Sequence, residues 1–187
     1  MSDLPLHPAI VHIAIGLGFV IPLVALGLTA ALWRGALPKR AWAIVVGLQA
    51  LVFAATLLAL RTGEAEEERV ERVVAERVIE THENAGKTFA LGAGLTLVLA
   101  ALGLALKKPA ATRALTVATT VAAIVVAGLT YRTGHSGGSL VYRHGAAAVY
   151  VTPSAGSSGG RAEALPGEDA IAPASGEENG DDEEDTE

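Results

Sequence analysis

Four long apolar runs dominate this sequence and restrict the folds that it can adopt. They lie at approximately 8–33, 41–61, 85–106 and 110–133. Each run has the roughly 20 residues that an α-helix needs to cross about 30 Å of hydrocarbon. A backbone inside a bilayer must satisfy its hydrogen bonds within the segment, so runs of this kind form helices. We therefore expect an all-α, four-helix transmembrane bundle in residues 1–150.

The composition agrees with a chain that lies in lipid. Hydrophobic residues make up 51% of the chain, but aromatic residues make up only 4%. The apolar mass is Ala, Leu, Val and Gly, which allows membrane helices to approach one another closely. The absence of cysteine excludes disulfides, thiolate-bound clusters and haem attached through a Cys-x-x-Cys-His motif. A bound metal would have to be held by histidine or carboxylate.

Two polar segments lie outside the apolar runs. Between the second and third runs, valines recur at helical spacing among charges from Glu66 to Glu80, which predicts an amphipathic extramembrane helix. This helix is expected either to lie on the membrane surface or to extend the third span outward. Residues 151–187 are rich in Ser, Gly, Pro and acid, and hold eleven of the twenty acidic residues. They predict a disordered acidic C-terminal tail.

The two short connections between spans predict the orientation of the chain. Both carry bases and no acid: Arg34, Lys39 and Arg40 in the first, and Lys107, Lys108 and Arg113 in the second. Cytoplasmic loops are enriched in Lys and Arg, so we expect both termini to lie outside the cytoplasm. Trp33 and Trp42 flank the first connection, where an aromatic belt at the membrane boundary would place them.

All five histidines are expected at one face of the membrane. With four spans, the two termini and the central connection share a side, whichever way the protein is inserted. The histidines fall at the start of the first span, at the start of the third, and after the fourth: His7 and His12, His82, and His135 and His144. Ionisable residues within membrane segments are rare, so this one-sided set indicates a site.

The spacing of two of these histidines favours a flat cofactor. Gly16 follows His12 by one helical turn, and Gly86 follows His82 by one turn, leaving room for a macrocycle. We therefore predict b-type haem for electron transfer, with His12 and His82 as the preferred axial pair. This hypothesis requires the helices of spans one and three to come close enough for the histidines to share a ligand.

Two further groups of residues complete this hypothesis. His135 and His7 form a possible second pair, if the fourth helix persists through Gly134 and the Gly137-Gly138 pair instead of ending there. Arg132 lies near the same face and could neutralise haem propionates, together with Lys87 and Arg143.

Other readings of the histidines stay open. Zinc or copper would use three histidines with Glu64 or Glu83. The histidines could also relay protons, or the chain could be a structural or assembly subunit without a cofactor. His7 could cap the first helix, His82 could be a solvated first-turn residue, and His144 could be interfacial. No hydrolytic constellation and no nucleic-acid signal is visible, so an independent enzyme is the least supported class.

Two stretches carry a family resemblance: Leu6-His7-Pro8-Ala9-Ile10-Val11-His12, and Gly134-His135-Ser136-Gly137-Gly138-Ser139-Leu140-Val141-Tyr142-Arg143-His144-Gly145. They resemble the bacterial membrane family known as domain of unknown function 2231, as do Thr62-Gly63 and His82-Glu83. The aromatic-proline pair usual after the second histidine is Ile13-Ala14 here.

The resemblance implies a four-helix domain, without an assigned reaction, in the bacterial inner membrane. Family members that stand beside Rieske or cytochrome modules imply an electron-transfer anchor with a respiratory or cytochrome partner. The lipid bilayer is the other expected partner. The sequence does not indicate an oligomeric state.

Overall fold

Four long helices make up most of the chain that the computed structural model describes, residues 6–150. They are α1 (Leu6–Trp33), α2 (Ala43–Val70), α3 (Glu76–Ala105) and α4 (Pro109–Tyr142), with two short 3-10 helices, η1 (Lys39–Trp42) and η2 (Ala146–Tyr150). All four long helices are long and apolar enough to cross a membrane, which confirms the predicted bundle. The predicted disordered tail, residues 151–187, lies outside the described residues.

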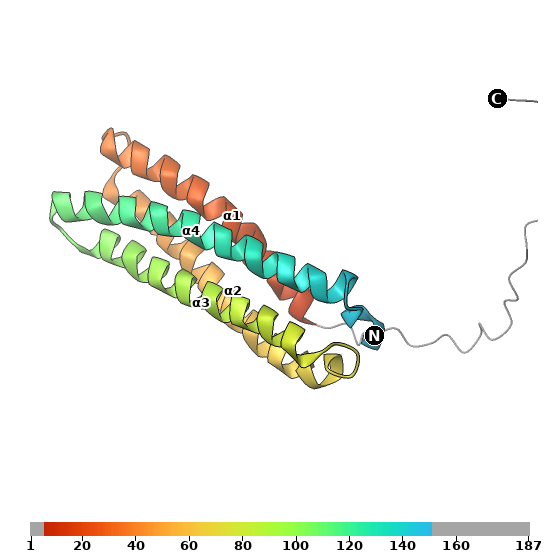
Figure 1. Ribbon diagram of the computed structural model, residues 1–187. Helices are drawn as coiled ribbons and strands as arrows, with labels where there is room; N and C mark the ends of the chain where they lie inside the picture. The colour runs from red at the N-terminus through yellow and green to blue at the C-terminus, as the bar shows by residue number, and fades with distance from the viewer. Residues whose placement is uncertain (1–5, 151–187) are drawn as a thin grey trace, which may run out of the picture. The chain divides into compact units, whose positions relative to one another are not determined.

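Successive helices run in opposite directions, as Figure 1 shows. α1 packs against α2 and α4, and α3 packs against the same two helices, so α1 and α3 lie diagonally opposite in the bundle. The first residues of α1 and α3 and the last residues of α2 and α4 meet at one end, which we call the histidine end (Figure 1). The even number of spans therefore brings four distant segments of the chain together.

The helices extend beyond the apolar runs that predicted them. α2 continues to Val70 instead of ending near residue 61, and α4 continues to Tyr142 instead of ending near residue 133. With 34 residues, α4 is about 51 Å long at a rise of 1.5 Å per residue, more than the hydrocarbon thickness requires. Glu and Arg are good helix formers, so α2 continues into the polar interface through residues 64–70.

The predicted amphipathic segment, residues 66–80, is not one helix, because two helices share it. Its first part ends α2, a turn follows at residues 71–75, and its last part begins α3. The buried Val74 packs with Ile79 of α3, Leu140 of α4 and Ala146 of η2. The apolar face of this segment therefore closes the histidine end of the bundle.

The glycines near the end of α4 continue the helix because they permit close packing. A Cβ at Gly134 would lie 3.3 Å from Ile15 Cδ1, and a Cβ at Gly137 would lie 3.0 Å from His82 Cε1. α4 ends at Tyr142, and the chain turns away at Gly145, whose φ of 69° few side chains tolerate.

The core is built from small residues and from polar side chains that bond between helices. The buried Gln49 of α2 donates to the Ala93 carbonyl of α3 at 3.0 Å, and Thr29 of α1 bonds to Thr120 of α4 at 3.0 Å. Polar side chains that bond across helices in this way help to hold membrane helices together. No buried side-chain nitrogen or oxygen lacks a hydrogen-bond partner within residues 6–150.

Trp42 lies in this core, which corrects its predicted place in an aromatic belt. Its side chain is fully buried, and its indole N–H donates to the Ala100 carbonyl at 3.1 Å. η1 turns the chain back over the end of α3, where Gly103 leaves room for the indole ring. Trp33, in contrast, is 51% exposed at the end of α1, as an interfacial tryptophan should be.

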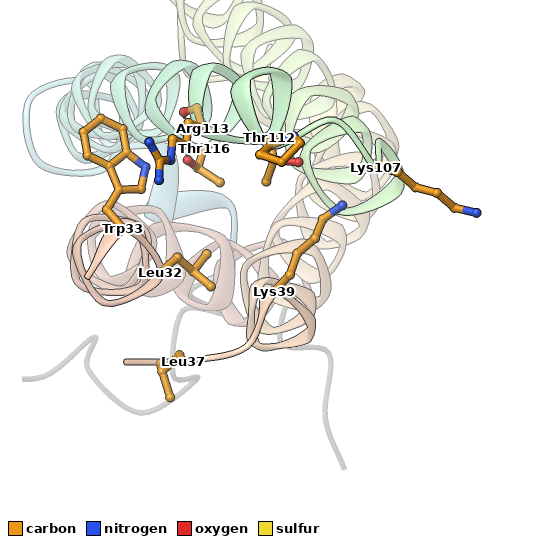
Figure 2. A pocket seen from close by; sticks show the side chains of 9 residues that line it. Leu32, Trp33, Leu37, Lys39, Lys107, Thr112, Arg113 and Thr116 are labelled. Atoms are coloured by element: carbon orange, nitrogen blue, oxygen red, sulfur yellow. Dashed lines mark hydrogen bonds between the residues drawn. The ribbon is translucent and has the colours of Figure 1, made fainter. Parts of the chain in front are cut away.

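The short connections meet at the other end of the bundle, which we call the basic end (residues 34–42 and 106–113). The Lys39 ammonium donates to the Leu106 carbonyl, and the Thr112 hydroxyl donates to the same oxygen at 3.1 Å. Figure 2 shows Lys39 reaching from η1 toward Thr112 on α4. Lys39 therefore ties the first connection to the second.

Large apolar side chains cover the outer surface of the helices. Leu23 is 71% exposed and Leu91 is 65% exposed, both in the middle of their spans. A soluble protein rarely exposes so much contiguous apolar surface, whereas a bilayer solvates it. The outward faces of the bundle therefore contact lipid.

The closest helix contact predicts a stability effect. An alanine Cβ at Gly18 of α1 would lie 2.5 Å from the buried Thr130 Oγ1 of α4. Gly18→Ala should therefore lower the unfolding free energy in detergent by about 1–3 kcal/mol. Gly27→Ala on the same helix is the control, because nothing lies within 4 Å of its added Cβ. Equal melting temperatures for the two variants would contradict this packing.

Candidate functional site

His7 and His82 meet in the interior of the histidine end. Their ring centroids are 6.2 Å apart, and the ring planes are nearly perpendicular, at 89°. His7 lies in the first turn of α1 and His82 near the start of α3, and both are partly buried. Because α1 and α3 are diagonal and not adjacent, the two side chains reach each other across the centre of the bundle.

The Nδ1 atoms of both rings are fixed by hydrogen bonds. His7 Nδ1 lies 2.8 Å from the Ala59 carbonyl oxygen of α2. A carbonyl can only accept, so His7 Nδ1 carries the proton and donates.

The same deduction holds for the second ring. His82 Nδ1 lies 2.9 Å from Ser136 Oγ of α4, and that hydroxyl donates its single hydrogen to the Thr133 carbonyl at 2.9 Å. Ser136 must therefore accept from His82 Nδ1. In their neutral forms, both imidazoles consequently have an unprotonated Nε2, the form that binds metals.

A glycine supports each ring from the neighbouring helix. A Cβ at Gly63 of α2 would lie 3.2 Å from His7 Cε1, and a Cβ at Gly137 of α4 would lie 3.0 Å from His82 Cε1. A side chain at either position would press on the imidazole. The site therefore uses all four helices: two supply histidines, and two supply the acceptors and the glycines.

The two helix hairpins contribute equivalent sets. In the first, His7 faces Thr62-Gly63, and the Thr62 hydroxyl lies 3.4 Å from its Nδ1. In the second, His82 faces Ser136-Gly137. The histidine and the hydroxyl are separated by 55 and 54 residues, respectively. This repeated spacing is the sequence signal that would have identified the pair.

The structure does not form the preferred pair of His12 with His82. His12 is exposed, and its Nδ1 lies 2.5 Å from the Pro8 carbonyl one turn earlier on α1. A residue five positions after His7 faces a different direction on the helix, so His12 points away from the bundle centre.

The second predicted pair, His135 with His7, is also not formed. His135 is exposed on α4 and stacks on Tyr131, with ring centroids 5.9 Å apart. His144 is exposed beyond the end of α4, and Arg132 is exposed on it.

The glycines chosen from the sequence do not contact the histidine rings. Nothing lies within 4 Å of a Cβ at Gly16, which is exposed, and a Cβ at Gly86 would meet Leu60 Cδ2 at 3.1 Å. Gly86 therefore serves the contact between α3 and α2. The residues that contact each imidazole ring come from a neighbouring helix and not from the helix that carries the histidine. Gly63 of α2 and Gly137 of α4 are the glycines in these positions.

No larger ligand set is assembled around the pair. Within residues 6–150, no group of three or more His, Asp, Glu or Cys side chains is placed to hold a metal ion. Of the two carboxylates considered for zinc or copper, Glu83 instead forms an ion pair with Lys87 at 2.7 Å. At this site, the described residues therefore provide two possible metal ligands, the Nε2 atoms of His7 and His82.

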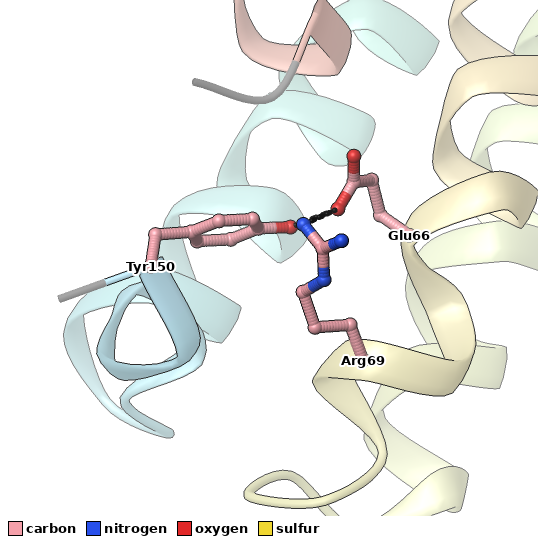
Figure 3. Close-up of polar contacts among 3 residues, drawn as sticks. All are labelled: Glu66, Arg69 and Tyr150. Carbon is pink, nitrogen blue, oxygen red and sulfur yellow. Dashed lines mark hydrogen bonds and ion pairs between the residues drawn. The ribbon is translucent and has the colours of Figure 1, made fainter. Parts of the chain in front are cut away.

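A contact that the sequence did not indicate fastens the segment after α4 to α2. The Tyr150 hydroxyl donates to Glu66 Oε2 at 2.6 Å, and Arg69 lies 3.4 Å from the same oxygen and 5.7 Å from the centre of the Tyr150 ring (Figure 3). Burial, followed by the hydrogen bond to Glu66, raises the pKa of Tyr150 to about 12. Since 84 residues separate the partners, no local pattern reveals them.

This contact predicts a pH dependence. The ordinary pKa of tyrosine is 10.0, so the folded protein holds the Tyr150 proton more tightly than the unfolded chain. Its contribution to stability is complete below pH 10.0 and is lost as the pH rises toward about 12. In an ultraviolet phenolate titration, Tyr150→Phe should remove the ionisation near pH 12. An unchanged titration curve would show that Tyr150 is not held by Glu66.

Four apolar helices with outward-facing leucines and valines define a multi-pass integral membrane protein. The chain belongs to the family described as predicted membrane protein DUF2231, whose model matches residues 3–150. This match confirms the resemblance noted in the sequence. No curated protein and no solved structure matches the chain.

Proposed function

We propose that this protein is a membrane subunit that binds b-type haem between His7 and His82 and takes part in electron transfer. The observation that carries the proposal is the pair of imidazoles in the bundle interior, each held at Nδ1 with Nε2 unprotonated. A histidine that ligates a metal usually donates its other ring N–H to a carbonyl or another acceptor. Ala59 and Ser136 supply these acceptors.

The donor set favours haem over a metal ion held by protein alone. Haem brings ring nitrogens of its own and would need few side-chain ligands, which His7 and His82 would supply, whereas zinc takes three or four ligands from side chains. The ring centroids of His7 and His82 lie 6.2 Å apart, so both imidazoles would be near enough to hold one group between them.

The surrounding residues suit a redox centre that is held rigidly. Bound haem would supply one-electron chemistry, and the protein would supply the ligands and exclude water. The partly buried position of the pair restricts solvent access, which raises the electrostatic influence of nearby charges. Arg132 and Arg143 at the same end could balance the propionates.

The exchange of electrons would take place at the face of the membrane where the histidines lie. The protein would lie in the bacterial inner membrane, as the family resemblance implies, and the positive connections favour both termini outside the cytoplasm, so the histidine end would face outward. A respiratory or cytochrome partner would then dock there. The acidic residues of the tail could attract a basic partner.

Spectra of the purified protein test the proposal. After haem-supplemented expression, the wild type in mild detergent should show a Soret band that shifts on dithionite reduction, with about one haem per chain. His7→Ala and His82→Ala should each abolish it, because each removes a histidine that would hold the haem. His12→Ala and His135→Ala are the matched controls, since both histidines are exposed.

Four results would redirect the proposal. A wild type without a Soret band excludes haem. Loss of haem in His12→Ala, but not in His7→Ala, would restore the pairing inferred from sequence. Stoichiometric zinc or copper without iron would support a metal centre, and a metal-free protein that co-purifies with a respiratory partner would support a structural or assembly role.

The hydrogen bond from His82 to Ser136 gives a second prediction. Ser136→Ala leaves His82 Nδ1 without its acceptor, so haem affinity should fall by about 10- to 100-fold, as for other partners of metal ligands. Haem titration of the apoprotein measures this affinity. Ser139→Ala, one turn further along α4, should leave it unchanged. Equal affinities in both variants would show that the orientation of His82 does not depend on Ser136.

A further inference from the structure

The basic end of the bundle concentrates positive charge without any acid. It carries six bases: Arg34, Lys39, Arg40, Lys107, Lys108 and Arg113. The sequence has no Asp or Glu between residues 4 and 63 or between 84 and 162, so every carboxylate of the described chain lies in residues 64–83. That segment lies at the histidine end. The cations must therefore be balanced by anions from outside the described bundle.

A pocket of about 240 Å³ opens among these cations. Its polar side is formed by Lys39, Lys107 and Arg113, and its apolar side includes Leu32 and Trp33 of α1. In Figure 2, Lys39 points toward Thr112 of α4, Arg113 extends toward Trp33, and Lys107 points outward. The pocket thus joins a cationic rim to an apolar wall.

The hydroxyls of the pocket donate elsewhere, so its remaining side-chain donors are the cations and the indole N–H of Trp33. The hydroxyl of Thr112 donates to Leu106, and that of Thr116 donates to the Arg113 carbonyl at 2.9 Å. Lys39 uses one of its three donors on the Leu106 carbonyl. The guanidinium of Arg113 and the remaining donors of Lys39 can therefore bind an anion with several acceptor oxygens.

The position of the pocket identifies the kind of anion. It lies where the apolar spans end, beside the exposed Trp33, at the level of lipid headgroups. An anion at this depth with an apolar part along Leu32 and Trp33 is an anionic phospholipid. We propose that the pocket between α1 and α4 at the basic end binds the phosphate headgroup of an anionic phospholipid, with an acyl chain against the apolar wall.

Lipid titration of the detergent-purified full chain, followed by native mass spectrometry, tests this site. The probes are phosphatidylglycerol and phosphatidylcholine with the same acyl chains. Wild type should bind phosphatidylglycerol about tenfold or more tightly than phosphatidylcholine, since each Lys or Arg near an anionic headgroup contributes measurably. The preference should weaken as salt is raised.

Two double variants separate the pocket from the general charge. Arg113→Gln with Lys107→Gln removes two cations that line the pocket, and should reduce the preference to about threefold or less. Arg40→Gln with Lys108→Gln removes the same charge from the same end, outside the lining, and should retain it. All four side chains are exposed, so melting temperatures should match the wild type.

Three results would overturn the proposal. The first is equal binding of the two lipids by the wild type. The second is an equal loss of preference in both double variants, which would indicate a diffuse charge effect. The third is inorganic phosphate that binds as tightly as phosphatidylglycerol, which would assign the pocket to a soluble anion. The haem proposal concerns the opposite end of the bundle, so these results neither support nor contradict it.

Discussion

A bilayer offers the backbone no water to bond to, so each membrane-spanning segment must satisfy its own hydrogen bonds as a helix. This constraint determines the rest of the molecule. Four spans necessarily alternate in direction, and an even number returns the chain to the face where it began. The two termini of the described bundle and the turn between α2 and α3 therefore meet at one end, which receives every histidine.

Close packing of the four helices brings His7 and His82 together at this common end. Because helices α1 and α3 are diagonal, their side chains meet only if α2 and α4 leave room beside them. Gly63 and Gly137 leave that room, and Ala59 and Ser136 fix the orientation of the rings from the same two helices. Each helix hairpin thus supplies one histidine and the acceptor and glycine that hold that histidine in place. The histidine pair therefore needs both hairpins.

The two ends of the bundle differ in charge, and each has its own chemistry. Acids and bases are mixed at the histidine end, where ion pairs such as Glu83 with Lys87 can form. The basic end has only cations, and lipid headgroups are the anions nearest to it. Long apolar helices separate the two ends, so the redox centre proposed at one end and the lipid contact proposed at the other would act independently.

The sequence by itself determined the four spans, the all-α class and the shared face of the histidines. Apolar length and chain parity decide these features, and neither depends on how a helix is rotated. Only the tertiary structure decided that His7, and not His12, meets His82, and that Trp42 is a core residue. Each residue turns a helix by about 100°, so which side chain faces the centre depends on the packing of neighbouring helices, and apolar length does not encode that packing.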